Sequence, residues 1–200
     1  MVDEKYDALG RRLRGVGLTP HEQILAADDH VRVNWILQQV RGAGSVLDVG
    51  AGDGSILRMV QTVTGATVFG IDRNRNIPPP DDIPWSIGDA LKVLPTLDPM
   101  DVALCCEVLQ WMEPAPGRRL LAAIRATTLI VTVPNRNCRS FRKLKRARLD
   151  GPAAVRDFSA TSLTTWLNRS GWRVIRQVEP IVGTALDGIW LGAVCHRGRS

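Results

Sequence analysis

Runs of apolar, β-branched residues alternate along this chain with stretches in which apolar residues recur at helical spacing. The runs predict strands, and the helical spacing predicts helices that pack against them. The predicted strands are residues 45–49, 67–71, 83–87, 101–106, 128–133, 171–175 and 188–195. The predicted helices are residues 28–40, 56–63, 116–126 and 163–169, with a further helix start at 19–22 and a short helix at Leu91. This pattern is typical of one α/β domain.

The stretch from Ser45 to Ser55 organises the rest of the chain. An apolar strand, 45–49, runs directly into Gly50, Gly52 and Gly54, and a helix follows. Glycines let the backbone approach a ligand closely, and amide groups at a helix N-terminus can point at a nucleotide-like molecule. A strand-to-helix turn without any ligand also favours glycine, so this spacing alone leaves both readings open.

Two carboxylates sharpen the prediction. Asp48 lies at the end of the first strand, where a buried carboxylate needs a cationic or hydrogen-bonding partner. Asp72 ends the second strand, roughly two dozen residues later, where an acidic residue can accept hydrogen bonds from both ribose hydroxyls of an adenosine ligand.

These residues resemble a known family. Residues 46–54, Val-Leu-Asp-Val-Gly-Ala-Gly-Asp-Gly, resemble motif I of the class I S-adenosylmethionine-dependent methyltransferases, and Gly70-Ile71-Asp72 resembles their motif II. Dinucleotide oxidoreductases have a Gly-x-Gly-x-x-Gly spacing instead, which residues 50–55 do not satisfy. The resemblance implies a Rossmann-like, seven-stranded, mostly parallel sheet whose last strand is antiparallel. Helices would cover both faces, and the ligand would lie over the carboxyl ends of strands one, two and four.

Two later segments resemble the same family. Gly88-Asp89-Ala90 resembles motif III, in which the acidic residue accepts from the adenine amino group; the alternative is that Asp89 only caps a short helix. Residues 107–112 resemble the segment after the fourth strand of small-molecule methyltransferases, often Glu-x-Leu-Glu-His. Trp111 stands at the place of that histidine, which puts histidine base chemistry in doubt.

The resemblance implies S-adenosylmethionine as the cofactor and assigns residues to it. The methionine part would lie against Gly50, Ala51 and Gly52, and Asp72 would hold the ribose. Asp48 would order the loop or meet the ammonium group of the cofactor through water. The adenine would be flanked by Arg73, Asp89 and Ala90, and Glu107 would line the floor near the sulfonium. Transfer then needs mainly in-line placement of the acceptor, so no catalytic base is assigned.

The acceptor is expected to be a small molecule methylated on oxygen, nitrogen or carbon. His30 and Arg32, on the helix before the first strand, could reach the site, although a surface role is an alternative for both. Trp111 could shape the acceptor pocket or belong to the core. His30 and Trp111 are therefore the candidate substrate-binding residues.

A basic segment, residues 136–148, holds seven Lys and Arg residues and no acidic residue. It could be solvated, or it could dock a phosphate-bearing substrate, RNA or an acidic partner. An RNA methyltransferase is therefore one alternative function. Another is a noncatalytic regulatory partner, resembling those that accompany homoserine acyltransferases.

Composition adds few constraints. The 200 residues predict a single methyltransferase domain over 20–200, preceded by a mobile arm over 1–19. The net charge of +6 allows nucleic acid as a partner without establishing it. Four cysteines without metal-ligand spacing predict no metal site and a reduced, cytoplasmic location. No signal sequence or membrane-spanning run is expected.

Overall fold

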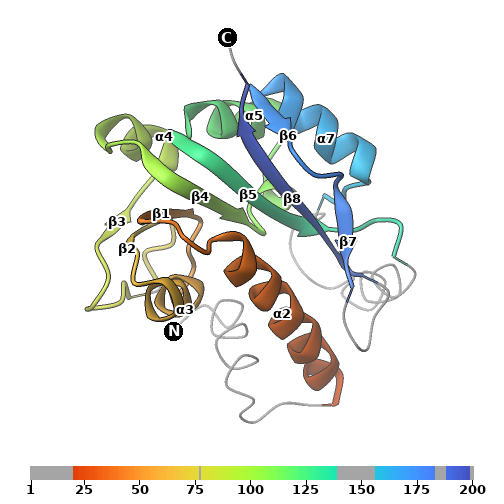
Figure 1. Ribbon diagram of the computed structural model, residues 1–200, viewed down its shortest axis with the longest axis horizontal. Helices are drawn as coiled ribbons and strands as arrows, with labels where there is room; N and C mark the ends of the chain where they lie inside the picture. The colour runs from red at the N-terminus through yellow and green to blue at the C-terminus, as the bar shows by residue number, and fades with distance from the viewer. Residues whose placement is uncertain (1–19, 77, 139–155, 183–187, 199–200) are drawn as a thin grey trace.

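The computed structural model describes residues 20–76, 78–138, 156–182 and 188–198, with the backbone alone for 20–28. Its centre is a sheet with the strand order β3-β2-β1-β4-β5-β8-β6, and β7 pairs with β8 off this path (Figure 1). The strands are β1 (Ser45–Val49), β2 (Thr67–Asp72), β3 (Trp85–Ile87), β4 (Met100–Cys106), β5 (Ala126–Pro134), β6 (Trp172–Val174), β7 (Glu179–Ile181) and β8 (Trp190–Arg197).

The strand directions confirm the predicted fold. The pairs β3–β2, β2–β1, β1–β4 and β4–β5 are parallel, whereas β8 is antiparallel to both β5 and β6. From β1 the chain adds β2 and β3 on one side and then returns to add β4 on the other side. The boundary between β1 and β4 is therefore the topological switch point of the sheet. Ligands of doubly wound sheets bind at the carboxyl ends of such strands.

Helices cover both faces of the sheet (Figure 1). On one face, α2 (Pro20–Gln39) and α3 (Ser55–Thr64) bury Val33, Ile36, Leu57 and Val60 against β1, β2 and β4. On the other face, α4 (Ala90–Val93), α5 (Pro114–Ala123) and α7 (Ala160–Arg169) pack over the larger apolar core. Two short 3-10 helices, η1 (Leu94–Thr96) and η2 (Leu109–Trp111), flank β4.

Several element boundaries differ from the predictions. The helix expected at 116–126 ends at Ala123, and Ala126 already belongs to β5, because the carbonyl of Arg125 accepts from the amide of Met100 and draws this backbone into the sheet. The helix start at 19–22 and the helix at 28–40 are one helix, α2. β7 was not predicted, since three residues that include a proline carry little strand signal.

The connection after β2 was correctly predicted to lack a helix, at 73–76 and 78–84, where three prolines remove donors. The expected arm, 1–19, lies outside the described residues. All four cysteines are buried, and none forms a disulfide. Within the described ranges, no helix combines the length and hydropathy needed to cross a membrane, and no cluster of three His, Cys, Asp or Glu residues could hold a metal.

Candidate active site

The loop between β1 and α3 reverses direction at three glycines. Gly50, Gly52 and Gly54 all have positive φ, at 81°, 60° and 75°, a region that residues with a side chain rarely adopt. A Cβ at Gly50 would also collide with the Val108 side chain, which follows β4. The loop therefore needs glycine at this position for two separate reasons. We define residues 48–54, Asp72 and Glu107 as the cradle.

The amides of this loop are engaged within the protein. Gly50 and Ala51 donate to the Ile71 carbonyl at 2.8 and 3.1 Å, and Gly54 donates to the Ala51 carbonyl at 3.0 Å. Gly52 donates to Asp72 Oδ2 at 2.8 Å. The sequence predicted amides that point at a ligand, and for these four the structure corrects that expectation. A pyrophosphate, which is held by such amides in dinucleotide-binding loops, would find these donors occupied.

Asp72 is a buried residue that joins two segments of the cradle. Its Oδ2 accepts from Gly52, and its Oδ1 accepts from the Asn74 amide at 2.8 Å, so one carboxylate ties the glycine loop to the end of β2. A carboxylate offers about four acceptor positions on its two oxygens, and two are used here. Asp72 can therefore still receive a diol.

Asp48 is buried at the end of β1, and its Oδ1 has no hydrogen-bond partner. Burial, with the nearby charge of Asp72, raises the pKa of Asp48 to about 7, although Arg32 opposes the shift. The cationic partner that the sequence required is Arg32, which acts on Asp48 as a charge and makes no hydrogen bond to its Oδ1. Asp48 holds a proton more readily than an ordinary aspartate.

Arg32 of α2 is buried beside the cradle. Its Nη2 lies 3.2 Å from Asp29 Oδ1, one helical turn earlier, and its Nε lies 3.1 Å from Glu107 Oε1. The guanidinium also lies 5.2 Å from the centre of the Trp190 ring, on β8. Burial lowers the pKa of Arg32, but Glu107 and Asp29 outweigh it and raise the pKa overall.

Sequence reasoning allowed Arg32 to reach the site but did not single it out. Its neighbour His30, a candidate substrate-binding residue, is exposed on the same helix. The available signal was the i, i+3 pair of Asp29 and Arg32 on the helix face that also holds Val33 and Ile36.

Glu107 has an unusual backbone. At φ 59° it is the only residue other than glycine with positive φ in the described part of the chain. Its amide donates to the Thr132 carbonyl of β5 at 2.9 Å, so the turn after β4 is held by the neighbouring strand. The side chain, 29% exposed, can therefore meet both Arg32 and solvent.

The other predicted residues lie around this centre. Asp89 is exposed, and its Oδ1 accepts from the Leu91 amide at 3.0 Å, so it does cap α4, which begins at Ala90. One carboxylate oxygen remains for an adenine amino group. Arg73 is exposed just beyond β2, and Trp111 is 39% exposed at the end of η2.

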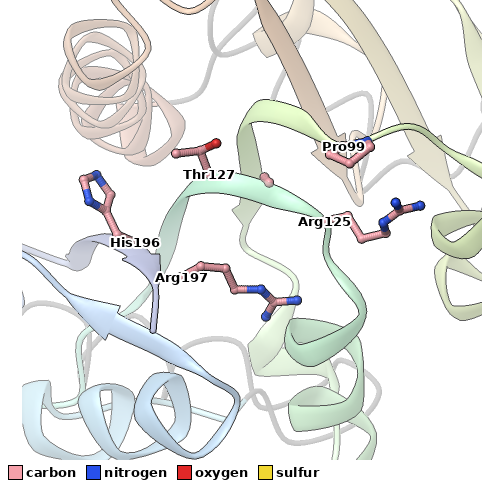
Figure 2. Close-up of a pocket in the computed structure, with 6 residues that line it drawn as sticks. Pro99, Arg125, Thr127, His196 and Arg197 are labelled. Atoms are coloured by element: carbon pink, nitrogen blue, oxygen red, sulfur yellow. The ribbon is translucent and has the colours of Figure 1, made fainter. Parts of the chain in front are cut away.

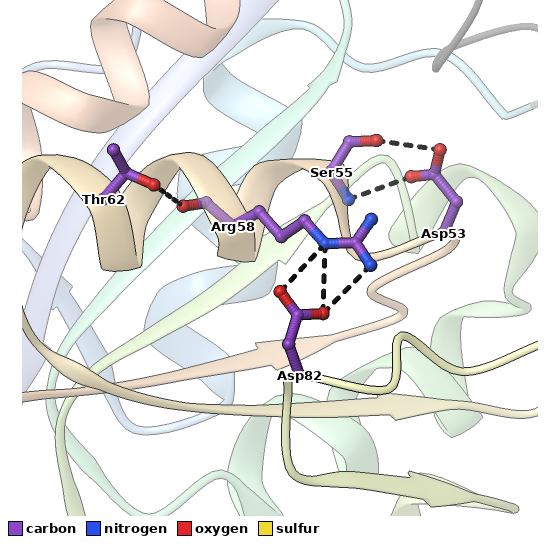
Figure 3. A network of polar contacts seen from close by, with 5 residues as sticks. All are labelled: Asp53, Ser55, Arg58, Thr62 and Asp82. Atoms are coloured by element: carbon purple, nitrogen blue, oxygen red, sulfur yellow. Dashed lines mark hydrogen bonds and ion pairs between the residues drawn. The ribbon is translucent and has the colours of Figure 1, made fainter.

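Polar contacts fix the start of α3 (Figure 3). Asp53 accepts from the amide and the hydroxyl of Ser55 at 3.0 and 2.8 Å, and Arg58 pairs with Asp82 at 3.0 Å. The first contact orders the helix N-terminus. The second joins α3 to the proline-rich connection, which lacks a helix of its own, and so supports that side of the cradle.

A hollow of about 500 Å³ lies elsewhere, at the amino ends of β4 and β5 (Figure 2). Its lining includes Arg125 and Arg197, but both already donate to backbone carbonyls, of Leu97 and of the C-terminal end of α5. Because the cradle lies at the opposite ends of the strands, this hollow is separate from it and contributes to no part of the candidate site.

A family model described as a methyltransferase domain matches residues 25–177. The chain belongs to the methyltransferase domain family. The resemblance carried by motifs I to III is thereby confirmed, and with it the enzyme class, the class I fold and the S-adenosylmethionine cofactor.

Solved structures agree with this methyltransferase fold. Magnesium protoporphyrin IX methyltransferase from Synechocystis, with bound S-adenosylhomocysteine, has a TM-score of 0.73 at 13% identity, covering 98% of this chain and 96% of its own. Human N-acetylserotonin methyltransferase, in complex with S-adenosylmethionine, has 0.68 at 15% identity, covering 97% and 58%. The pyocyanin biosynthetic protein PhzM has 0.68 at 19%, covering 95% and 62%. The comparison of this chain with curated protein sequences found no match.

This chain spans less than two thirds of the human methyltransferase and of PhzM. At such identities the likeness establishes the fold alone. The acceptor and the residue roles of this methyltransferase must therefore be argued from its own side chains.

Proposed function

We propose that this methyltransferase transfers the methyl group of S-adenosylmethionine to an oxygen, nitrogen or carbon atom of a small molecule. One observation carries the cofactor side of the proposal: the cradle is lined by carboxylates, while four amides of its loop donate within the protein. A cradle of this kind suits an adenosyl ligand that carries a sulfonium and an ammonium group, and disfavours one that carries phosphates.

The binding roles follow from the unused acceptors. Asp72 would receive the ribose hydroxyls on the lone pairs that Gly52 and Asn74 leave open. Asp89 and Ala90 would meet the adenine edge and Arg73 would flank it, while Gly50, Ala51 and Gly52 would lie against the methionine part. Asp48 would order the loop from below, and Glu107 would face the sulfonium.

The bound cofactor supplies a methyl group on a positively charged leaving group. The protein then needs to hold the acceptor atom in line with that methyl group and to exclude water. Trp111 would offer an apolar surface to the acceptor, and its partial exposure four residues after Glu107 supports this role. His30 stays a weaker candidate because it is exposed on α2.

A small-molecule acceptor is supported by the Glu107–Met112 segment and by the two similar structures whose names state small-molecule acceptors. The basic segment, 136–148, lies outside the described residues apart from 136–138, so it adds no geometry in favour of RNA.

Calorimetric titration with S-adenosylmethionine and, separately, with S-adenosylhomocysteine tests the cofactor. We expect micromolar binding of both. A methyl-labelled cofactor is then offered to a panel of small phenols, carboxylates and amines and, in parallel, to bulk RNA. Label in the small molecules supports the proposal. Label in RNA alone would replace it with the RNA alternative, and a well-folded, cofactor-free protein that binds neither ligand would favour the noncatalytic partner.

A further inference from the structure

The hollow at the amino ends of β4 and β5 is basic (Figure 2). It has a volume of about 500 Å³, within the range of small-molecule sites. The segment before β4, the start of β5 and the end of β8 form its lining, so the fold brings together parts of the chain that are far apart in the sequence. Its described lining contains no acidic residue and consists of Pro99, Arg125, Ala126, Thr127, His196 and Arg197.

Arg197 is fixed at one side of the hollow. Its Nη2 donates to the carbonyls of Ala122 and Ile124 at 2.8 and 2.9 Å, and its guanidinium lies 4.7 Å from the centre of the Trp172 ring. Nε and Nη1 keep their hydrogen atoms for another acceptor. Burial lowers the pKa of Arg197, and no carboxylate in the described part of the chain opposes this shift. An anion in the hollow would supply the missing partner.

Arg125 contributes a second guanidinium, just before β5. Its Nη1 donates to the Leu97 carbonyl at 2.9 Å, which leaves Nε, Nη2 and one hydrogen of Nη1 without a partner among the described residues. Neither Arg125 nor Arg197 forms an ion pair with a described carboxylate. Because backbone carbonyls already orient both guanidiniums, they can hold the oxygen atoms of an anionic ligand without a large loss of side-chain freedom.

More positive charge lies next to the hollow. The β-ladder places Arg173 of β6 directly opposite His196, and Thr128 of β5 opposite His196 on its other side. Directly opposed residues point to the same face of a sheet, so these three side chains form one row. Arg173 and His196 are exposed, and neither has a polar partner among the described residues. Arg173 therefore extends the positive potential of the hollow, which attracts anions toward it.

We propose that this hollow binds a small molecule through a terminal phosphate group. The free N–H groups of Arg125 and Arg197 donate to the phosphate oxygens, and Thr127 and His196 add donors from the same lining. A phosphate monoester carries about 1.5 to 2 negative charges at pH 7, which matches two guanidiniums, whereas a carboxylate or a backbone phosphate diester carries only one. The site goes beyond methyl transfer, because the cradle lies at the opposite ends of the strands.

Calorimetric titration of the full chain with phenyl phosphate tests the site at about 0.15 M salt, where attraction between distant surface charges is screened. We expect a dissociation constant of about 1 mM or below, and binding of benzoate that is weaker by about 10-fold or more. Arg125→Gln and Arg197→Gln should each weaken phenyl phosphate binding by about 10-fold or more, since a hydrogen bond to a charged group is lost. Arg119→Gln removes the same charge from an exposed position of α5 and should leave the affinity unchanged.

Failure of the wild-type protein to bind phenyl phosphate would overturn the proposal, as would equally tight binding of benzoate or equal weakening by Arg119→Gln. RNA without terminal phosphates tests the other source of phosphate. If it binds more tightly than phenyl phosphate and loses that affinity in Arg125→Gln, the hollow belongs to a nucleic-acid backbone and the small-molecule ligand is contradicted. Arg197 also holds the end of α5, so if Arg197→Gln does not fold, Arg125→Gln alone decides the outcome.

Discussion

The carboxylate of Asp72 combines a structural role with a proposed role in ligand binding. It joins the glycine loop to β2 through the amides of Gly52 and Asn74, and it is the proposed acceptor for the ribose hydroxyls. A residue with this double role shapes the pocket even when no ligand is bound. Its removal should therefore affect both ligand affinity and loop order.

We expect Asp72→Ala to weaken S-adenosylmethionine binding by roughly 10- to 100-fold, because a charge-assisted hydrogen bond contributes about 1.5 to 3 kcal/mol. Calorimetry of the folded variant measures this. Asp81→Ala removes an exposed carboxylate from the connection after β2 and serves as the control. Unchanged affinity in Asp72→Ala would remove Asp72 from the ribose role.

Asp48 predicts a pH dependence. Its pKa is raised to about 7 from an ordinary value of 3.8, so the folded protein holds this proton over a range in which the unfolded chain has lost it. The contribution of Asp48 to stability must therefore fall as the pH rises from about 4 to about 7, and then stay level. This sign is opposite to that of an ordinary ion-paired aspartate.

Asp48→Asn cannot ionise and isolates this effect. Between pH 5 and pH 8, we expect the wild-type protein to lose on the order of 2 kcal/mol of unfolding free energy relative to Asp48→Asn. Denaturant unfolding of both proteins at the two pH values gives the difference. Parallel pH profiles would mean that Asp48 titrates normally.

Among the elements, β3 depends on one close contact. Gly70 of β2 pairs with Trp85 of β3, and a Cβ at position 70 would collide with the Trp85 ring, which also packs near Gly54. Trp85 therefore fastens the edge strand to the start of α3. The edge strand β3 has only three residues, and the Trp85 ring holds it against β2 and α3.

Gly70→Ala should destabilise the protein by roughly 1 to 3 kcal/mol through overpacking. Adding Trp85→Leu should recover part of the loss, because the smaller side chain leaves room for the new methyl group. Thr67→Ala, at an exposed position of the same strand, is the matched control for denaturant unfolding. A Gly70→Ala protein as stable as the wild type would show that the ring moves aside without cost.

The central strands could be predicted because each is a long, continuous run of apolar residues in the sequence. β4, β5 and β8 are buried apolar runs, and the errors at their ends arise where a tertiary hydrogen bond decides the boundary, as at Arg125. Within the site, Asp48 and Asp72 stand in motifs of fixed spacing. The Arg32–Glu107 pair could not be predicted, since it depends on how α2 docks against β4.

At the scale of the whole molecule, ligand binding should raise stability, because only the folded protein has the cradle. At 100 times its dissociation constant, S-adenosylmethionine should add about 2.7 kcal/mol, or roughly 5 to 10 °C in Tm for a domain of this size. Differential scanning fluorimetry over a ligand series checks this. Asp72→Ala at the same ligand concentration should shift less, and the absence of any shift in the wild type would count against the cofactor site.

The position of β8 has a consequence for synthesis in the cell. This strand lies between β5 and β6, yet it is the last described strand of the chain, ending at Arg197. While the chain is still being translated, the apolar edge of β5 has no neighbour, although β1 to β5 have already emerged. An unpaired strand edge invites other chains to add to it. Ribosomes that stall before this last strand would therefore release aggregation-prone chains, and nascent chains of this protein would benefit from a chaperone until residue 197 is made.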